Sequence, residues 1–193
     1  KFNSTEQMNV FTRVIRDLAV AELLQDEYEA NPAIDLQTYD RIIYGKTASL
    51  FQTACESAAV YSGVDDATRK HFADFGQSIG RFFQIRDDYL DYFGADILNK
   101  APYQDFTNGL YTYPVLVCRS NLQNLASDGD REAQQALDQL EETFTAPKAH
   151  RDDKTVQKKF RELLEKWNAK EETRKHLETL SKNLDDCLER MPS

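Results

Sequence analysis

Long segments of this 193-residue chain carry apolar residues at spacings of three and four, and few helix-breaking residues interrupt them. The chain has only seven glycines and five prolines, while 40% of its residues are hydrophobic. A period near 3.6 residues is that of an amphipathic α-helix, and a chain of this length can bury a sizeable core. The sequence therefore predicts an all-α fold, with residues 1–193 forming a single domain.

Local signals locate the ends of the predicted helices. A first helix is expected to end near Tyr28, before Asn31-Pro32, because proline disfavours helical backbone at the residue before it. The other signals are Asp35 and either Asp65 or Asp66 as N-caps, Gly63 as a C-terminal stop, and Pro114 in the first turn of a helix from around Thr112. Residues 1–144 then contain the helices that carry the motifs described below.

The segment from Thr145 to Asp153 is the best candidate for a linker, because it combines Pro147 with residues of mixed charge. Beyond it, residues 154–191 alternate charged residues with apolar ones at helical spacing. We expect two amphipathic helices there, packed on the rest of the chain.

Two glycines, Gly76 and Gly80, lie one turn apart in a segment whose aromatic and aliphatic side chains are expected to face inward. Each costs about 1 kcal/mol relative to alanine inside a helix. A close helix crossing or a ligand against the backbone would explain them, although simple tolerance is an alternative. The expected inward set is Phe72, Phe75, Ile79 and Phe83, with Phe82 and Tyr89 as further core aromatics.

Charge and cysteine usage exclude several classes of protein. The net charge of −9 argues against nucleic acid as a partner, because phosphate backbones are bound by clustered Lys and Arg. The cysteines are few, odd in number and far apart, which indicates reduced thiols in a cytoplasmic protein. No apolar run reaches the roughly 18 residues that span a bilayer. The chain opens at Lys1 rather than Met, which suggests a fragment.

A cluster of carboxylates is the strongest chemical signal. Asp87, Asp88 and Asp91 follow Gln84 at spacings that place them together on a helix, where like charges repel unless a cation bridges them. Mg²⁺ prefers hard oxygen ligands and is commonly held by a few carboxylates together with substrate phosphate. The cluster therefore predicts a Mg²⁺ site for a diphosphate. The alternative is a solvated acidic helix surface, which is common in acidic proteins.

Several blocks in this order resemble the C-terminal half of the trans-polyprenyl diphosphate synthases. The resemblance runs roughly from Phe11 to Val117. Its blocks are Lys46-Thr47-Ala48-Ser49-Leu50-Phe51, then Phe83-Gln84-Ile85-Arg86-Asp87-Asp88-Tyr89-Leu90-Asp91, then Asn99-Lys100 with Asp105, and Thr112-Tyr113-Pro114.

The resemblance implies a bundle of long helices of the isoprenoid synthase type around a deep cavity, incomplete here on its N-terminal side. It implies a transferase that condenses isopentenyl diphosphate with an allylic prenyl diphosphate and makes a membrane-partitioning product. Asp87, Asp88 and Asp91 would be the second aspartate-rich motif and would bind Mg²⁺. Lys46 and Lys100 would contact the diphosphate, Thr47 would help hold the allylic carbocation, and Gln84 would face the same region.

Each of these residues also has an ordinary interpretation. A single helical lysine such as Lys46 is more often a solvated charge, and Lys100 alone in a loop is a weaker signal still. Gln25 stands where the family often has an inward glutamine, but a surface glutamine is equally expected. The three histidines are isolated and receive no chemical role.

The chain departs from the family pattern in its first half. The first aspartate-rich motif is absent, and so are the arginines that bind isopentenyl diphosphate. We therefore expect the chain alone to be inactive. The alternative is a noncatalytic or regulatory subunit of a heteromeric prenyl synthase, so the partner is either a second copy in a homodimer or a prenyl synthase subunit. A terpene cyclase of similar fold would need an Asn/Asp-Asp-x-x-Ser/Thr-x-x-x-Glu block. It is disfavoured, because the Ser/Thr position is Asp91 and the Glu position is Ala95.

Overall fold

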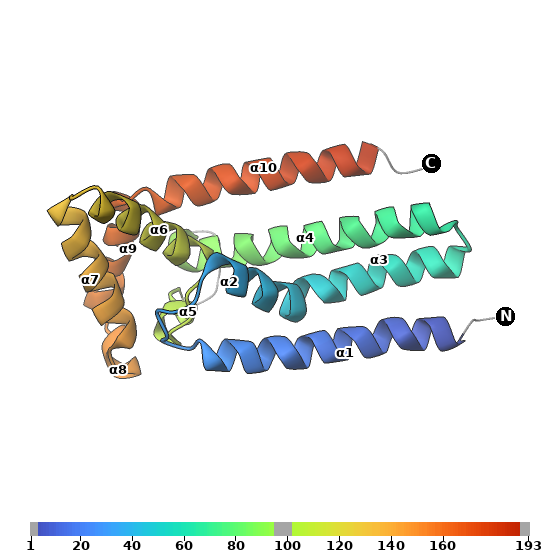
Figure 1. Ribbon diagram of the computed structural model, residues 1–193, viewed down its shortest axis with the longest axis horizontal. Helices are drawn as coiled ribbons and strands as arrows, with labels where there is room; N and C mark the ends of the chain where they lie inside the picture. Colours follow the sequence, from blue (N-terminus) through green and yellow to red (C-terminus); the bar gives the residue numbers. More distant parts are fainter. Residues whose placement is uncertain (1–3, 95–101, 190–193) are drawn as a thin grey trace. The chain divides into compact units, whose positions relative to one another are not determined.

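The computed structural model describes residues 4–94 and 102–189, and every regular element in these ranges is helical (Figure 1). The all-α prediction is confirmed. The elements are α1 Ser4–Glu27, α2 Leu36–Ile43, the π-helix η1 Tyr44–Ala48, α3 Ser49–Ser62, α4 Asp66–Phe93, α5 Gln104–Thr107, α6 Tyr113–Ser127, α7 Arg131–Thr145, α8 Lys148–Arg151, α9 Lys154–Lys166 and α10 Ala169–Glu189.

Contacts divide the chain into two compact units. The first comprises residues 1–25, 40–84 and 177–193, and the second comprises residues 26–39 and 85–176. Helix α4 is continuous and contributes its first nineteen residues to the first unit and the rest to the second. The single-domain expectation for residues 1–193 stays a prediction.

Small residues bring the helices of the first unit close together, with α3 between α1 and α4 in Figure 1. A Cβ atom built on Gly80 would lie 2.5 Å from Cα of Ala48, and one built on Gly76 would lie 2.6 Å from the carbonyl oxygen of Phe51. A Cβ on Gly45 would likewise meet the backbone of α1, 2.4 Å from the carbonyl oxygen of Asp17. Of the explanations open for the glycine pair, the structure therefore supports the close helix crossing.

The same crossing corrects the expected set of inward residues on α4 at Phe83, which is 50% exposed. Ala73, Gly76 and Gly80 are the buried residues of this face. Small side chains occupy the contact because only they let the two backbones approach. The other expected residues, Phe72, Phe75 and Ile79, lie on the flanks and are half-buried.

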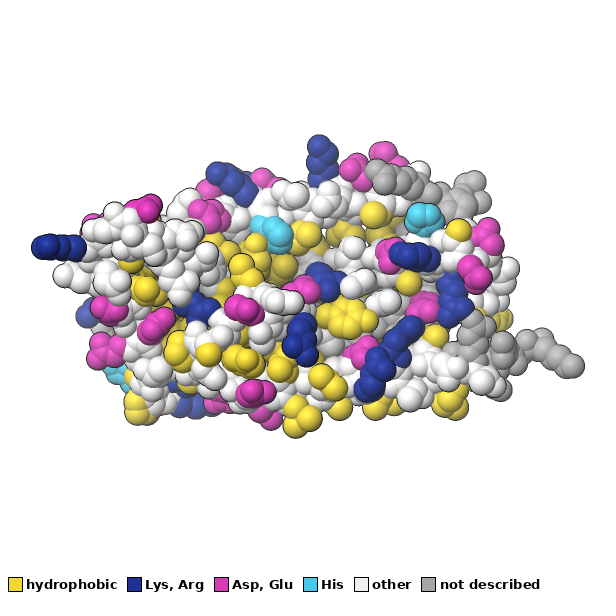
Figure 2. Space-filling view, viewed as in Figure 1, with side chains coloured by type: hydrophobic (Ala, Val, Ile, Leu, Met, Phe, Trp, Pro, Cys, Tyr) yellow, Lys and Arg dark blue, Asp and Glu magenta, His cyan; other side chains and the backbone are white. Residues whose placement is uncertain are grey.

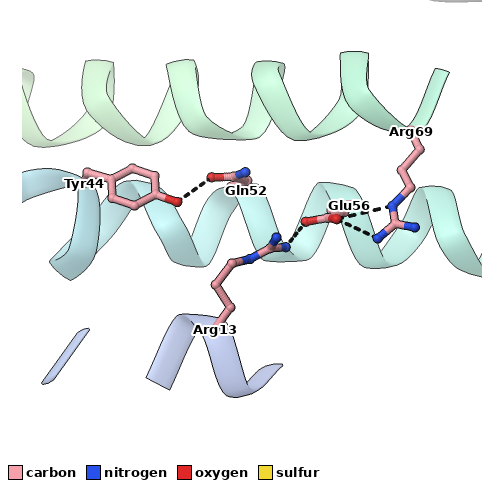
Figure 3. Close-up of polar contacts among 5 residues, drawn as sticks. All are labelled: Arg13, Tyr44, Gln52, Glu56 and Arg69. Carbon is pink, nitrogen blue, oxygen red and sulfur yellow. Dashed lines mark hydrogen bonds and ion pairs between the residues drawn. The ribbon is translucent and has the colours of Figure 1, made fainter. Parts of the chain in front are cut away.

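A buried carboxylate joins three helices of the first unit. Figure 3 shows Glu56 of α3 between Arg13 of α1 and Arg69 of α4. Arg69 Nη2 lies 2.8 Å from one carboxylate oxygen of Glu56, and Arg13 donates to the other. The Glu56 side chain is only 8% exposed. Its two guanidinium partners supply the compensation that a buried charge requires.

Aromatic side chains form the core of the second unit. Phe106 stacks on Phe160 with ring centroids 4.3 Å apart, and Tyr111 stacks on Phe144 at 4.1 Å. The rings of Phe106 and Phe144 meet edge to face at 5.4 Å. These contacts fix α5 against α7 and α9, because offset stacking and edge-to-face packing both favour defined ring positions.

The linker prediction for residues 145–153 is wrong. The segment contains α8 and buries Arg151, which is 4% exposed. The Arg151 guanidinium donates to the carbonyl oxygens of Phe144, at 2.7 Å, and of Ala146 and Thr107. A charged residue that satisfies main-chain acceptors from inside the core could not be recognised from its sequence context. The two amphipathic helices predicted for residues 154–191 are confirmed as α9 and α10.

The predicted helix ends are confirmed where the structure describes them. Asp35 accepts from the backbone N–H of Thr38 at 2.7 Å, and Asp65 accepts from that of Thr68 at 2.8 Å. Gly63 ends α3 with φ of 68°. All three cysteines are free thiols. Within the described ranges, none of the helices combines the length and apolarity needed to cross a bilayer.

Candidate functional site

The Lys46-Thr47 block lies on η1, in the first unit. The backbone hydrogen bonds of a π-helix span one more residue than those of an α-helix, and such segments occur frequently at functional sites. The hydroxyl of Thr47 donates to Oε1 of Gln84 at 2.7 Å. Lys46 Nζ donates to Oε1 of Gln25 at 2.8 Å and lies 3.2 Å from Glu22. Two predicted catalytic residues, Thr47 and Gln84, therefore meet, and Gln25 binds the adjacent Lys46. Lys46 and Thr47, with their partners Gln25 and Gln84, are called the polar group on η1 below.

Asp88 lies in the second unit and is 1% exposed. Its Oδ2 atom accepts hydrogen bonds from the hydroxyl of Tyr39 at 2.5 Å and from the backbone N–H of Tyr113 at 3.1 Å. Tyr113 is the first residue of α6, so its N–H is one of the donors left unpaired at a helix N-terminus. The positive end of the helix dipole also favours a carboxylate at this position.

The environment of Asp88 keeps Tyr39 protonated. Burial raises the pKa of the Tyr39 phenol well above its usual value, and the neighbouring Asp88 carboxylate raises it further. The phenol therefore remains a hydrogen-bond donor even at a pH near 10, the usual pKa of tyrosine.

Asp91 is bound to the helix that follows the acidic block. One carboxylate oxygen accepts from the backbone N–H of Gln104 at 3.0 Å, and the other accepts from that of Asp105 at 3.1 Å. The Asp91 carbonyl oxygen also accepts from the N–H of Tyr103 at 3.0 Å. With 6% exposure, Asp91 fixes the start of α5 to the end of α4.

The three aspartates do not form a preformed metal cage. Across residues 4–94 and 102–189, no three His, Cys, Asp or Glu side chains gather in a way that could hold a metal ion. Asp88 and Asp91 are directed at backbone donors and at Tyr39, whereas Asp87 is the half-buried member of the group. This donor set still fits Mg²⁺, because that ion usually keeps several waters and takes only one or two carboxylates besides substrate oxygens.

Lys100, one of the predicted site residues, lies outside the described residues. Tyr39, which the sequence analysis did not single out, is hydrogen-bonded to the acidic block. Its partner Asp88 is 49 residues away. No local pattern could have paired them, although a tyrosine among aliphatic residues indicates a polar atom that needs a partner when buried.

Comparison with known sequences identifies the family. The polyprenyl synthetase family matches residues 1–148. That range contains Lys46, Thr47, Gln84, Lys100 and the three aspartates. The chain belongs to the polyprenyl synthetase family, and the predicted membership among the trans-polyprenyl diphosphate synthases is confirmed.

Two curated relatives illustrate the similarity. The chain is 33% identical over 137 residues to a prenyl transferase of Synechocystis, with 70% of this chain and 42% of the relative covered. It is 41% identical over 102 residues to decaprenyl-diphosphate synthase of Dictyostelium discoideum, with 51% of this chain and 22% of the relative covered. The chain thus matches less than half the length of either.

Solved structures share the fold over nearly the whole chain. A polyprenyl synthase from Caulobacter crescentus CB15, crystallised with calcium and isoprenyl diphosphate, has a TM-score of 0.79 and 27% identity, covering 99% of this chain and 55% of that one. A decaprenyl diphosphate synthase from Rhodobacter capsulatus has a TM-score of 0.79 and 24% identity, covering 98% and 55%. The latter shows the fold alone.

Proposed function

We propose that this chain is part of a Mg²⁺-dependent prenyltransferase that condenses isopentenyl diphosphate with an allylic prenyl diphosphate. The observation that carries the proposal is the polyprenyl synthetase match, because it contains the entire acidic block and the Lys46-Thr47 block. A relative that was crystallised with calcium and isoprenyl diphosphate supports a site for a divalent cation and a diphosphate.

The acidic end of α4 would hold the metal. The resemblance implies all three aspartates as ligands. We propose that Asp87 makes the direct contact and that Asp88 and Asp91, whose carboxylates accept from backbone N–H groups, complete the site by fixing α4 to the starts of α6 and α5. Mg²⁺, when bound, neutralises the charge that develops on a departing diphosphate.

The polar group on η1 would act on the substrates. Lys46 would contact the diphosphate, and so would Lys100. Thr47 and Gln84 would present oxygen atoms to the allylic cation. In the reaction the allylic carbon–oxygen bond breaks and the diphosphate leaves with the bonding electrons. The double bond of isopentenyl diphosphate then supplies the pair for the new carbon–carbon bond, and loss of a proton restores a double bond. Preorganised charges that stabilise a leaving group account for much of the catalysis in such steps.

Metal-dependent diphosphate binding tests the proposal. Inorganic diphosphate is titrated calorimetrically into the chain with MgCl₂ and again with EDTA. Asp87→Asn should weaken Mg²⁺-dependent binding by about tenfold or more, because contacts to a charged group contribute about 1.5–3 kcal/mol. Asp74→Asn is the matched control, since Asp74 is an exposed acid on the same helix that pairs with Lys70. Equal affinities for wild type and Asp87→Asn would exclude this metal site.

The chain alone should not complete the reaction. A second group must grip the leaving diphosphate and position isopentenyl diphosphate, and the sequence contains one aspartate-rich motif of the two that the family uses. Incubation with both substrates and MgCl₂ should give no elongated product. Product from the purified chain would mean that a second copy supplies the missing groups in a homodimer.

A noncatalytic or regulatory subunit is the second candidate. It is motivated by the sequence given, which carries one of the two aspartate-rich motifs that the family uses. A regulatory subunit would change the product length of a catalytic prenyl synthase when the two are mixed, while Asp87→Asn would leave that change intact.

We infer a cytoplasmic location for either candidate, and free thiols are consistent with a reducing compartment.

A further inference from the structure

We propose that Tyr39 is a positioning residue for this metal and diphosphate site, acting through Asp88. The inference rests on the proposed function, and it concerns a side chain that would touch neither the metal nor the substrate. Tyr39, Asp88 and Tyr113 all belong to the second unit.

The contact is specific and buried. Tyr39 is 5% exposed and Asp88 is 1% exposed, and the 2.5 Å separation from phenol oxygen to Oδ2 is typical of a hydrogen bond to an ionised acceptor. Tyr113 N–H approaches the same oxygen at 3.1 Å. Two donors that converge on one oxygen set the rotation of the carboxylate about its Cβ–Cγ bond.

Fixing Asp88 also fixes its neighbour. Asp87 precedes Asp88 on α4, so a rotation or shift of this turn would move the carboxylate that the proposal assigns to the metal. Tyr39 and the first residue of α6 both donate to the Asp88 carboxylate and so restrain this turn of α4. Asp91, on the next turn, accepts from the start of α5 and restrains that turn. Groups hydrogen-bonded directly to a metal ligand typically change affinity by about 10–100-fold when removed. Tyr39 acts one residue further from the metal, so we expect an effect at the lower end of that range.

Aromatic packing holds the ring of Tyr39 in place independently of the hydrogen bond made by its hydroxyl. The rings of Tyr39 and Tyr113 lie 6.0 Å apart between centroids. Tyr39→Phe therefore removes the donor and preserves the ring, which separates the hydrogen bond from the packing. Tyr111→Phe is the matched control. Tyr111 is 3% exposed and in the same unit, and its hydroxyl has no hydrogen-bond partner among the described residues.

The test measures binding of inorganic diphosphate in MgCl₂ by calorimetry, together with thermal unfolding of the same chains. Tyr39→Phe should weaken Mg²⁺-dependent binding by about tenfold, while Tyr111→Phe should leave it within about twofold of wild type. The Asp88→Asn background supplies the decisive comparison. If Tyr39 acts through Asp88, adding Tyr39→Phe to Asp88→Asn should weaken binding by less than about twofold further, which is strong non-additivity.

The outcomes separate the two proposals. Wild-type chain that binds diphosphate equally with MgCl₂ and with EDTA would overturn the proposed function and the role of Tyr39 with it. Metal-dependent binding that Tyr39→Phe leaves unchanged would overturn the positioning role alone. Additive losses in the double variant would also overturn it. A Tyr39→Phe chain without a cooperative unfolding transition would assign the hydroxyl to stability, and the positioning role would fall.

Discussion

The hydroxyl of Thr47 lies 2.7 Å from Oε1 of Gln84, so η1 and α4 are joined by a polar contact. The neighbouring residue Ala48 lies against Gly80, where a Cβ on the glycine would lie 2.5 Å from Cα of Ala48. The contact between two predicted catalytic residues thus depends on a helix crossing that only a glycine permits.

Gly80→Ala should consequently destabilise the first unit. The new methyl group would meet backbone atoms of η1, which cannot turn aside as a flexible side chain would. We expect the free energy of unfolding to fall by about 1–3 kcal/mol, despite the better helix propensity of alanine. Chemical denaturation monitored by circular dichroism provides the measurement.

Ser78→Ala is the control for this crossing. Ser78 is on the same helix, and its hydroxyl donates to the carbonyl oxygen of Asp74, within its own helix. Its removal should change the free energy of unfolding by no more than about 0.5 kcal/mol. If both substitutions had the same small effect, the helices would separate easily and the close approach would not matter for stability.

Glu56→Gln should also destabilise the chain, because it leaves Arg13 and Arg69 facing a neutral side chain (Figure 3). The Glu56 side chain is 8% exposed, but Arg13 is 37% exposed. The loss should thus fall below that of a fully buried pair, at about 1–3 kcal/mol. Lys70→Gln removes an exposed pair with Asp74 and should cost less than about 0.5 kcal/mol. Equal losses in the two denaturation curves would show that the burial of Glu56 adds nothing.

Sequence reasoning located the helix ends well because their causes are local. Asp35, Asp65 and Gly63 act within three residues of their own positions, through a side-chain cap or a left-handed φ. The order of the helices followed from the same signals. The π-helix was not predicted, since a segment of only five residues is too short to show a hydrophobic pattern different from that of an α-helix.

The environment of the acidic block could be predicted only in part. The spacing of Asp87, Asp88 and Asp91 was visible, but their partners come from distant segments. Tyr39 reaches Asp88 from 49 residues away, and Asp91 accepts from a segment 13 and 14 residues further on. The direction of each carboxylate is set by these tertiary contacts, which no periodicity encodes. The linker prediction around Arg151 was wrong for the same reason, because the partners that bury this side chain include a distant segment.

His176 should give the chain a pH-dependent stability. The imidazole stacks on Tyr113 at 4.8 Å between centroids, and burial lowers its pKa below 6.5. The unfolded chain therefore binds more protons than the folded chain just below pH 6.5. Stability is fully present above that pH and declines as the pH falls toward the folded pKa.

His176→Phe keeps a flat ring against Tyr113 and removes the titrating group. Free energies of unfolding are measured between about pH 5 and about pH 7.5, a range that brackets the usual histidine pKa. They should fall less steeply toward acid pH for the variant than for wild type. Parallel curves would show that histidine protonation at this position is not linked to folding.

Helix α1 carries an exposed apolar face. Met8, Phe11, Ile15 and Leu18 are 64%, 53%, 68% and 44% exposed, and Figure 2 shows hydrophobic side chains along the lower edge of the view, over α1. Their spacing of three, four and three is that of a helix–helix seam, and a contiguous apolar surface of this kind favours association. The chain should self-associate with increasing concentration in sedimentation velocity experiments.

Phe11→Glu combined with Ile15→Glu should shift the chain toward the monomer without changing its helical circular dichroism spectrum. As a control, Thr12→Glu introduces a charge at a neighbouring exposed position, and it should leave association unchanged. A wild-type chain that stays monomeric at every concentration would show that this face does not drive association.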